Sequence, residues 1–182
     1  MSTDAKVVAV VGVGPGLGRA LAVRFAHGGF SVALVARKDA SLRPVQSEIE
    51  GVGGAVRSYV CDATNEKSVA ATFARINEEL GSPEALMYNA GAFKAGGILE
   101  LSATDFEQAW RVNCLGALLT AQAVVPGMLE RGGAAFSIRV RPLHSEEARG
   151  SPGSQWASLV CALSLNQWLA SWVRRESMWF TS

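Results

Sequence analysis

A set of closely spaced glycines near the start of the chain is the first feature whose spacing suggests chemistry. The glycines follow a mostly β-branched run, 7–11, and precede apolar residues at helical spacing: Gly12, Gly14, Gly16 and Gly18. A strand that turns tightly into a helix needs glycine where its backbone approaches another group closely. The first N–H groups of such a helix have no acceptor within it. We therefore expect a phosphate site here, lined also by Leu17; a purely structural strand-to-helix corner is the alternative.

Two basic residues follow the next apolar run. Arg37 and Lys38 come directly after Ser31–Ala36, and no acid precedes Asp39. In dinucleotide-binding folds an acid at this strand end holds a ribose 2′-hydroxyl, whereas a basic residue accommodates a 2′-phosphate. We therefore expect NADP(H) in preference to NAD(H), with Arg37 as the phosphate contact and Lys38 in support. A pair of solvated charges at a strand end is the alternative.

Further polar residues stand at the ends of two later strand-like runs and inside a helical pattern. Asp62 and Ala63 follow residues 56–60, and Asn89, Ala90 and Gly91 follow residues 85–88. Asn113 lies within a long helical pattern, where asparagine has a poor propensity and needs a reason. The structural alternative is that Asn113 is a polar cap at the kink of a buried helix.

The elements that must carry these residues alternate between strand and helix. Short apolar runs predict strands over 7–11, 31–36, 56–60 and 85–88. Apolar residues at helical spacing predict helices over 16–30, 40–51 and 67–80 and a long helix from Ser102 to Gly132. This alternation is typical of parallel β-α-β units with helices on both faces. The expected fold class is α/β: a Rossmann-like, doubly wound parallel sheet with flanking helices, truncated on its C-terminal side.

Three motifs resemble the short-chain dehydrogenase/reductase family. The glycine spacing G-x-x-x-G-x-G at 12–18 resembles its first motif, with Val11 at the family's threonine position. Residues 88–91, Y-N-A-G, resemble its N-N-A-G, and residues 112–116, V-N-C-L-G, resemble its V-N-x-x-G. The resemblance implies hydride transfer between NADP(H) and a small carbonyl or alcohol substrate.

The resemblance also implies roles for single residues. Asp62 matches an aspartate beside the adenine, and residues 89–91 match a segment that lines the cofactor and steadies the central sheet. Asn113 matches the asparagine of a catalytic tetrad, which holds a proton-relay water. These roles make Asn113 the only catalytic residue that we expect in the recognisable part of the chain.

The resemblance stops after Gly133. The family would next supply a strand ending in a catalytic serine and a helix bearing Tyr-x-x-x-Lys, but the only tyrosines are Tyr59 and Tyr88, and no lysine follows Lys94. Tyr88 is the least implausible substitute acid, although its strand position points it into the packing. We therefore expect a dinucleotide-binding domain, 1–133, a divergent tail, 134–182, and impaired catalysis. A non-catalytic nucleotide-binding or interaction protein with the same fold is the alternative.

Back-translation indicates that the tail is family-like sequence read one base out of phase. A coding string for Gly-Lys-Phe-Gly-Leu-Arg-Ala-Leu-Ala-Gln, read without its first base, encodes residues 157–165. The same phase accounts for 167–178 and, upstream, for 139–148. Tryptophan and methionine have one codon each, so the matches leave little freedom. In that phase the residue four before the lysine cannot be tyrosine, although phenylalanine is allowed.

Composition and cysteine usage narrow the class further. The 182 residues carry a net charge of +1, without the basic excess of a nucleic-acid binder. Cys61, Cys114 and Cys161 lack metal-binding spacing and predict buried reduced thiols, no metal site and a cytoplasmic protein. The acidic start and the polar residues within the uncharged stretch 155–173 argue against export and against a membrane span. A truncated sheet would leave an edge that invites homo-oligomer formation.

Overall fold

The computed structural model describes residues 6–93, 99–131 and 135–138. The chain forms two compact units: the first contains Met1–Gly91 and Leu115–Arg139, and the second contains Ala92–Cys114 and Val140–Ser182. The tail that we expect to be out of phase, 139–182, lies outside the described residues.

The first unit is built on a five-stranded parallel sheet with the strand order β3-β2-β1-β4-β5. The strands are β1 (Val7–Val11), β2 (Ser31–Ala36), β3 (Val56–Val60), β4 (Ala85–Tyr88) and β5 (Ala135–Ile138). The first four confirm the predicted ranges, whereas β5 was not predicted. The order reverses between β1 and β4, and ligands of such sheets bind outside the carboxyl ends of the strands at this point.

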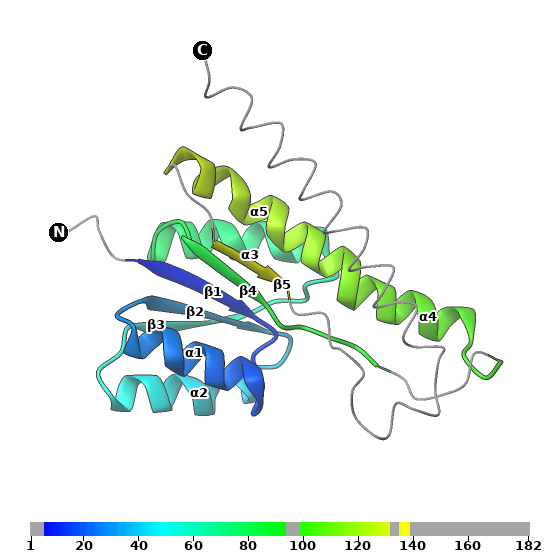
Figure 1. Ribbon diagram of the computed structural model, residues 1–182, viewed down its shortest axis with the longest axis horizontal. Coiled ribbons are helices and arrows are strands. Elements are labelled where there is room, and N and C mark those ends of the chain that lie inside the picture. Colours follow the sequence, from blue (N-terminus) through cyan, green and yellow to red (C-terminus); the bar gives the residue numbers. More distant parts are fainter. Residues whose placement is uncertain (1–5, 94–98, 132–134, 139–182) are drawn as a thin grey trace, which may run out of the picture. The chain divides into compact units, whose positions relative to one another are not determined.

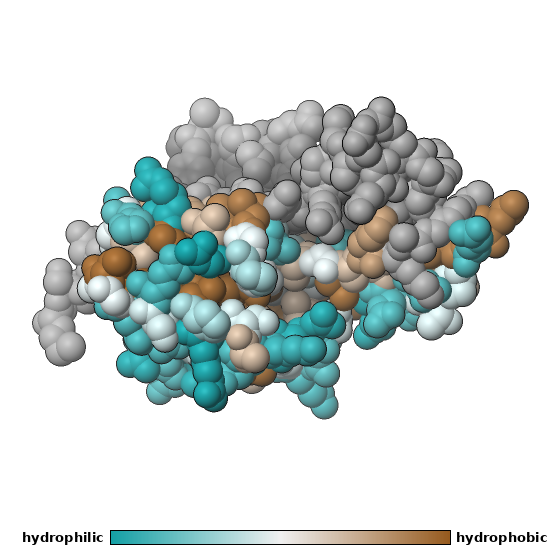
Figure 2. Space-filling view, turned by 90° about the horizontal axis from the view of Figure 1, so that it is seen from below, coloured by the Kyte–Doolittle hydropathy of each residue, from teal (hydrophilic) through white to brown (hydrophobic). Residues whose placement is uncertain are grey.

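Helices cover both faces of this sheet, as predicted. Helices α1 (Leu17–His27) and α2 (Asp39–Gly51) pack on one face, and α3 (Glu66–Glu79) and α5 (Gly116–Glu130) pack on the other (Figure 1). The outward side of α1 and α2 is mainly hydrophilic (Figure 2). On that side Arg19 joins the two helices through two hydrogen bonds of 2.5 and 2.6 Å to the Glu48 carboxylate.

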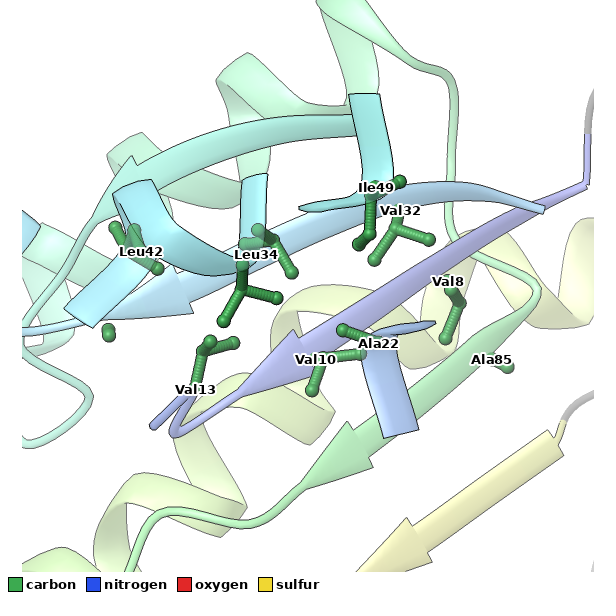
Figure 3. Packing of buried hydrophobic residues seen from close by; sticks show 11 residues of the cluster. Val8, Val10, Val13, Ala22, Val32, Leu34, Leu42, Ile49 and Ala85 are labelled. Atoms are coloured by element: carbon green, nitrogen blue, oxygen red, sulfur yellow. The ribbon is translucent and has the colours of Figure 1, made fainter. Parts of the chain in front are cut away.

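The strands bury alternate residues on opposite faces. Toward α1 and α2 the core is made of small and branched side chains, of which Figure 3 labels Val8, Val10, Val13, Ala22, Val32, Leu34, Leu42, Ile49 and Ala85. Val and Leu strands buried on both faces are typical of parallel sheets, because the helices exclude water from each side. Burial of one valine, leucine or isoleucine side chain contributes roughly 1.5–3 kcal/mol to the free energy of folding.

The opposite face is closed by α3 and α5. Val69, Phe73 and Ile76 of α3 and Val124 and Met128 of α5 are at most 2% exposed. The helical segment Ala103–Glu130 is long and apolar enough to cross a membrane by length and composition alone. The burial of one side of α5 in the core explains the apolar composition of that helix without a membrane.

The predicted long helix from Ser102 to Gly132 is confirmed as one helical segment, Ala103–Glu130, but it contains a π-helical turn that the sequence did not predict. Helix α4 (Ala103–Trp110) starts at Ser102, whose hydroxyl accepts a hydrogen bond of 3.1 Å from the Asp105 N–H. A π-helical turn, η1 (Arg111–Leu115), then precedes α5. Such turns are rare and occur often at functional sites.

Candidate functional site

Gly12 and Gly18 are glycines because the backbone leaves no room for a side chain. Gly12 has a φ of +88°, and a β-carbon there would lie 2.2 Å from the Ala90 nitrogen. A β-carbon on Gly18 would lie 2.6 Å from the Gly12 carbonyl oxygen. The turn is therefore packed tightly against the end of β4 and against the start of α1.

Gly14 and Gly16 are different, because a β-carbon at either would meet no protein atom within 4 Å. Helix α1 begins after Gly16 without a side-chain cap. In the part of the chain that the structure describes, the N–H groups of Leu17 and Gly18 have no hydrogen-bond acceptor. An open backbone cradle with free N–H groups at a helix start fits an anionic ligand such as a phosphate.

Asn89 joins the end of β4 to this turn. Its backbone N–H donates to the Val11 carbonyl oxygen at 2.7 Å, and its side-chain Nδ2 donates to the Gly12 carbonyl oxygen at 2.9 Å. Asn89 is thus held beside the cradle at the point where the strand order reverses. Ala90 lies against Gly12, so the structure brings these two predicted segments together.

Arg37 and Lys38 lie at the adjacent strand end. The N–H groups of Gly12 and Val13 both donate to the Val35 carbonyl oxygen, at 2.8 and 3.2 Å, so the end of β2 runs beside the glycine turn. Both basic side chains are exposed, and neither has a carboxylate partner among the described residues. By contrast, ion pairs engage Arg19, Arg43, Arg57 and Arg75.

Asp62 follows the end of β3. The Cys61 N–H donates to the Ala36 carbonyl oxygen at 2.9 Å, which brings Asp62 alongside the β2 end that carries Arg37. The exposed Asp62 carboxylate accepts two hydrogen bonds from Thr64 on Oδ1. Ala63 is buried, and its carbonyl oxygen lies against Gly116 of α5.

Tyr88 is 1% exposed and its hydroxyl lies against Gly116. Burial, followed by the nearby Asp62 and Cys61, raises the pKa of Tyr88 well above its usual value. A buried phenol that holds its proton so firmly is a poor general acid near neutral pH. The expectation that Tyr88 points into the packing is therefore confirmed.

Asn113 belongs to the second unit and lies within η1. Its Oδ1 accepts from the Ala92 N–H and its Nδ2 donates to the Ala92 carbonyl oxygen, both at 3.0 Å. This paired arrangement imitates the exchange of hydrogen bonds between two strands. The side chain thereby fixes the segment that follows Gly91, which gives a physical reason for asparagine at this position.

The cysteines differ from one another. Cys61 is a buried free thiol, as expected. Cys114 is disulfide-bonded, which corrects the expectation of a reduced thiol at that position. Over the described ranges, no group of three or more His, Cys, Asp or Glu side chains is placed to hold a metal ion.

Three contributors to the site were missed in the sequence. Thr64 and Ser68 hold Asp62, and Gly116 makes room for Tyr88. An aspartate side chain often accepts from the backbone N–H two residues later, so the bond from the Thr64 N–H could have been predicted, whereas the bond from its hydroxyl could not. Gly116 is part of the motif at 112–116, but nothing in the sequence shows that it faces the Tyr88 hydroxyl.

A doubly wound parallel sheet with an open glycine turn at its reversal point is the architecture of the Rossmann-like α/β proteins. Residues 6–138 match the short chain dehydrogenase family. The chain belongs to this family, and it is a homologue of NAD(P)-dependent oxidoreductases.

Known relatives illustrate the match. D-threitol dehydrogenase of Mycolicibacterium smegmatis is 33% identical over 133 residues, 73% of this chain and 51% of that protein. A variant of actinorhodin polyketide ketoreductase, solved with NADPH, is 29% identical, with a TM-score of 0.71, 75% of this chain covered and 53% of that one. A 7α-hydroxysteroid dehydrogenase, solved with NADH and a 7-oxo bile acid conjugate, is 28% identical, with a TM-score of 0.69 and coverage of 73% and 52%. The chain thus spans about half the length of these relatives.

Proposed function

We propose that the first unit binds NADP(H) in preference to NAD(H) and is the cofactor-binding part of an oxidoreductase acting on a small carbonyl or alcohol substrate. The observation that carries the proposal is the pair of exposed cations Arg37 and Lys38, which have no carboxylate partner among the described residues and lie beside the open glycine cradle. An unpaired cation at the end of β2 attracts a 2′-phosphate, whereas an acid there would repel it.

Each part of the site has one role in this proposal. The N–H groups of Leu17 and Gly18 donate to the pyrophosphate, and Gly14 and Gly16 allow it to approach the backbone. Arg37 and Lys38 hold the 2′-phosphate, and Asp62 and Ala63 flank the adenine. Asn89 keeps the turn in place through Gly12, and Ala90 and Gly91 line the nicotinamide half.

The bound nicotinamide would supply or accept a hydride. Asn113 is proposed as the residue that supports a proton-relay water. In this role it keeps its two hydrogen bonds to the Ala92 backbone. Proton transfer by a positioned side chain typically contributes about 10² to 10⁴-fold in rate. Because the chain as written lacks a recognisable Tyr-x-x-x-Lys, we expect only trace turnover from it.

The proposal is tested by titrating the purified protein with NADPH and NADH and repeating both titrations on Arg37→Asp. We expect tighter binding of NADPH, and a reversal of the preference in the variant. Arg24→Asp is a matched control, because Arg24 is a basic residue in the last turn of α1. Equal affinities for both cofactors before and after Arg37→Asp would contradict the proposal.

A non-catalytic nucleotide-binding protein is the second candidate, favoured by the burial of Tyr88 and by the missing Tyr-x-x-x-Lys. NADPH oxidation over a broad carbonyl panel separates the two candidates. Trace turnover that disappears in Asn113→Ala favours the enzyme, whereas NADPH binding with no turnover above the rate without protein favours the second candidate.

A further inference from the structure

Strand β3 is the outermost strand on its side of the sheet, and in the described part of the chain it pairs with β2 alone. On the side of β2, the Ala55 carbonyl oxygen accepts a hydrogen bond and the Cys61 N–H donates one, both at 2.9 Å. Backbone groups of a strand face its two neighbours alternately, so the odd-numbered residues bond to β2. The N–H and C=O groups of Val56, Ser58 and Val60 therefore point outward, where an added strand can bind.

The sequence of this edge is nearly symmetric about its middle residue. Residues 56–60 read Val-Arg-Ser-Tyr-Val. In an antiparallel pair of two copies centred on Ser58, Ser58 lies opposite its counterpart, and Val56 lies opposite Val60 of the second copy. These are the residues whose backbone groups point outward, and each such pair exchanges two hydrogen bonds. The valine contact also covers Val60, which is 58% exposed in the single chain.

The hydroxyl of Ser58 is consistent with this register. Its Oγ is buried and has no hydrogen-bond partner among the described residues. A buried hydroxyl without a partner is unfavourable, because it has lost its bonds to water. Each hydroxyl can donate and accept, so the two Ser58 hydroxyls that face each other across the symmetry axis can bond to one another.

The charges at the edge are complementary in the same register. Arg57 lies opposite Tyr59 of the second copy, and the Tyr59 hydroxyl donates to Glu79 Oε2 at 3.1 Å. Each Arg57 thus comes close to a carboxylate of the other copy. Within one chain Arg57 lies 3.5 Å from Glu79, and its side chain is 59% exposed, so it is free to reach across. A shift of two residues would place Arg57 opposite Arg57, and like charges directly opposite are destabilising.

We propose that the free edge of β3 binds a second copy of this chain, antiparallel and centred on Ser58, so that one sheet continues through both molecules. The dimer is symmetric, because the same surface is used by both copies. The surface is separate from the glycine turn, and it lies at the opposite end of the sheet from β5. A charged residue on an edge strand can instead keep other chains away. The two roles of Arg57 predict opposite results.

Disulfide crosslinking of the full chain tests the register. In Ser58→Cys the two new cysteines would have Cα atoms about 5.5 Å apart, within the range of a disulfide. Val60→Cys is the matched control, because that position is exposed but lies more than about 13 Å from its counterpart, four residues along the strand. Mild oxidation should give a covalent dimer in Ser58→Cys and not in Val60→Cys. Equal crosslinking of both variants, or none in Ser58→Cys, overturns the inference.

Sedimentation velocity of charge-reversed variants tests the partner. We expect the wild-type chain to dimerise with a dissociation constant of about 1–100 μM, since the interface is small. Arg57→Glu and Glu79→Arg should each weaken the dimer at least about tenfold, because like charges then meet across the axis. An equal mixture of the two variants should dimerise about as well as the wild type, because opposite charges meet at both contacts.

The mixture distinguishes a contact between copies from an ion pair within one chain, which mixing cannot restore. A wild-type chain that stays monomeric, a mixture that does not associate, or stronger association of Arg57→Glu alone overturns the inference. Association that neither charge reversal weakens uses another surface and also overturns it. If Glu79→Arg does not fold, the crosslinking of Ser58→Cys and Val60→Cys still decides the matter. None of these outcomes depends on cofactor binding.

Discussion

The hydroxyl of Tyr88 lies where a β-carbon on Gly116 would come within 2.4 Å of it. The largest residue at the end of β4 is therefore matched to the smallest residue at the start of α5. The same β-carbon would lie 3.1 Å from the Ala63 carbonyl oxygen. Three segments of the first unit thus meet at a position that admits no side chain.

Gly116→Ala should destabilise the protein by roughly 1–3 kcal/mol, the usual cost of overpacking a core. Tyr88→Phe/Gly116→Ala should recover part of this loss, because it removes the nearest atom but leaves the Ala63 contact. Urea unfolding of the wild-type protein, both single variants and the double variant gives the coupling. If the destabilisation in the double variant equals the sum of the two single effects, Tyr88 and Gly116 do not interact.

Two glycines of the same turn should respond in opposite ways. Gly12→Ala should cost roughly 1–3 kcal/mol or more, because it combines a left-handed φ with a backbone clash. Gly14→Ala should leave the melting temperature unchanged and raise the dissociation constant for NADPH about tenfold, because its methyl group occupies the cradle. Calorimetry and cofactor titration measure the two effects. Unaltered NADPH binding by Gly14→Ala would show that NADPH does not approach the backbone at Gly14.

The alkaline stability of the protein should depend on Tyr59. Burial, then the hydrogen bond and the charge of Glu79, raise the pKa of Tyr59 to about 12. In the unfolded chain a tyrosine ionises near pH 10, so the native state keeps its proton longer. This contribution is complete below about pH 10 and is lost as the pH rises toward about 12.

Unfolding free energies at pH 9 and pH 11 measure this effect. The wild-type protein should lose more stability between the two pH values than Tyr59→Phe does, and Tyr88 contributes equally to both proteins. A matching loss in the two proteins would show that Tyr59 ionises as it does in the unfolded chain.

The coding DNA should contain a change of reading frame near the codon for residue 139. The family match ends at residue 138, and the out-of-phase strings begin at residue 139. Sequencing from the codon of Gly133 onward, with mass spectrometry of the natural protein, tests this. We expect an uninterrupted family-like frame one base away. Stop codons within that frame would disprove it.

Four strands and the cradle could be predicted from the sequence because their signals are local. The four apolar runs are followed, directly or after one residue, by Gly12, Arg37, Asp62 and Asn89, and each ending marks a carboxyl edge of the sheet. Strand β5 was missed because it has only four residues and comes shortly after the two glycines, 132 and 133, that end the helical pattern. The helix around Asn113 was predicted, but its π-helical turn was not. The spacing of apolar residues does not show whether a short segment has i→i+5 or i→i+4 hydrogen bonds.

The partners of the polar side chains could not be predicted, because they depend on contacts between distant segments. Asn89 bonds to Gly12, 77 positions away, and Asn113 bonds to Ala92, 21 positions away. Family resemblance named both asparagines but not what they hold. That Arg37 has no carboxylate partner within the described part of the chain likewise could not be predicted, because it depends on where the carboxylates of other segments lie.

The central place of β1 has a consequence for synthesis on the ribosome. This strand emerges before both of its neighbours, because it pairs with β2 on one side and with β4 on the other. Until residue 88 has emerged, one edge of an uncharged valine-rich strand has no partner, and such edges recruit other chains. We therefore expect nascent chains that stall before β4 to depend on chaperones, and translation of Ala85–Tyr88 to end that dependence.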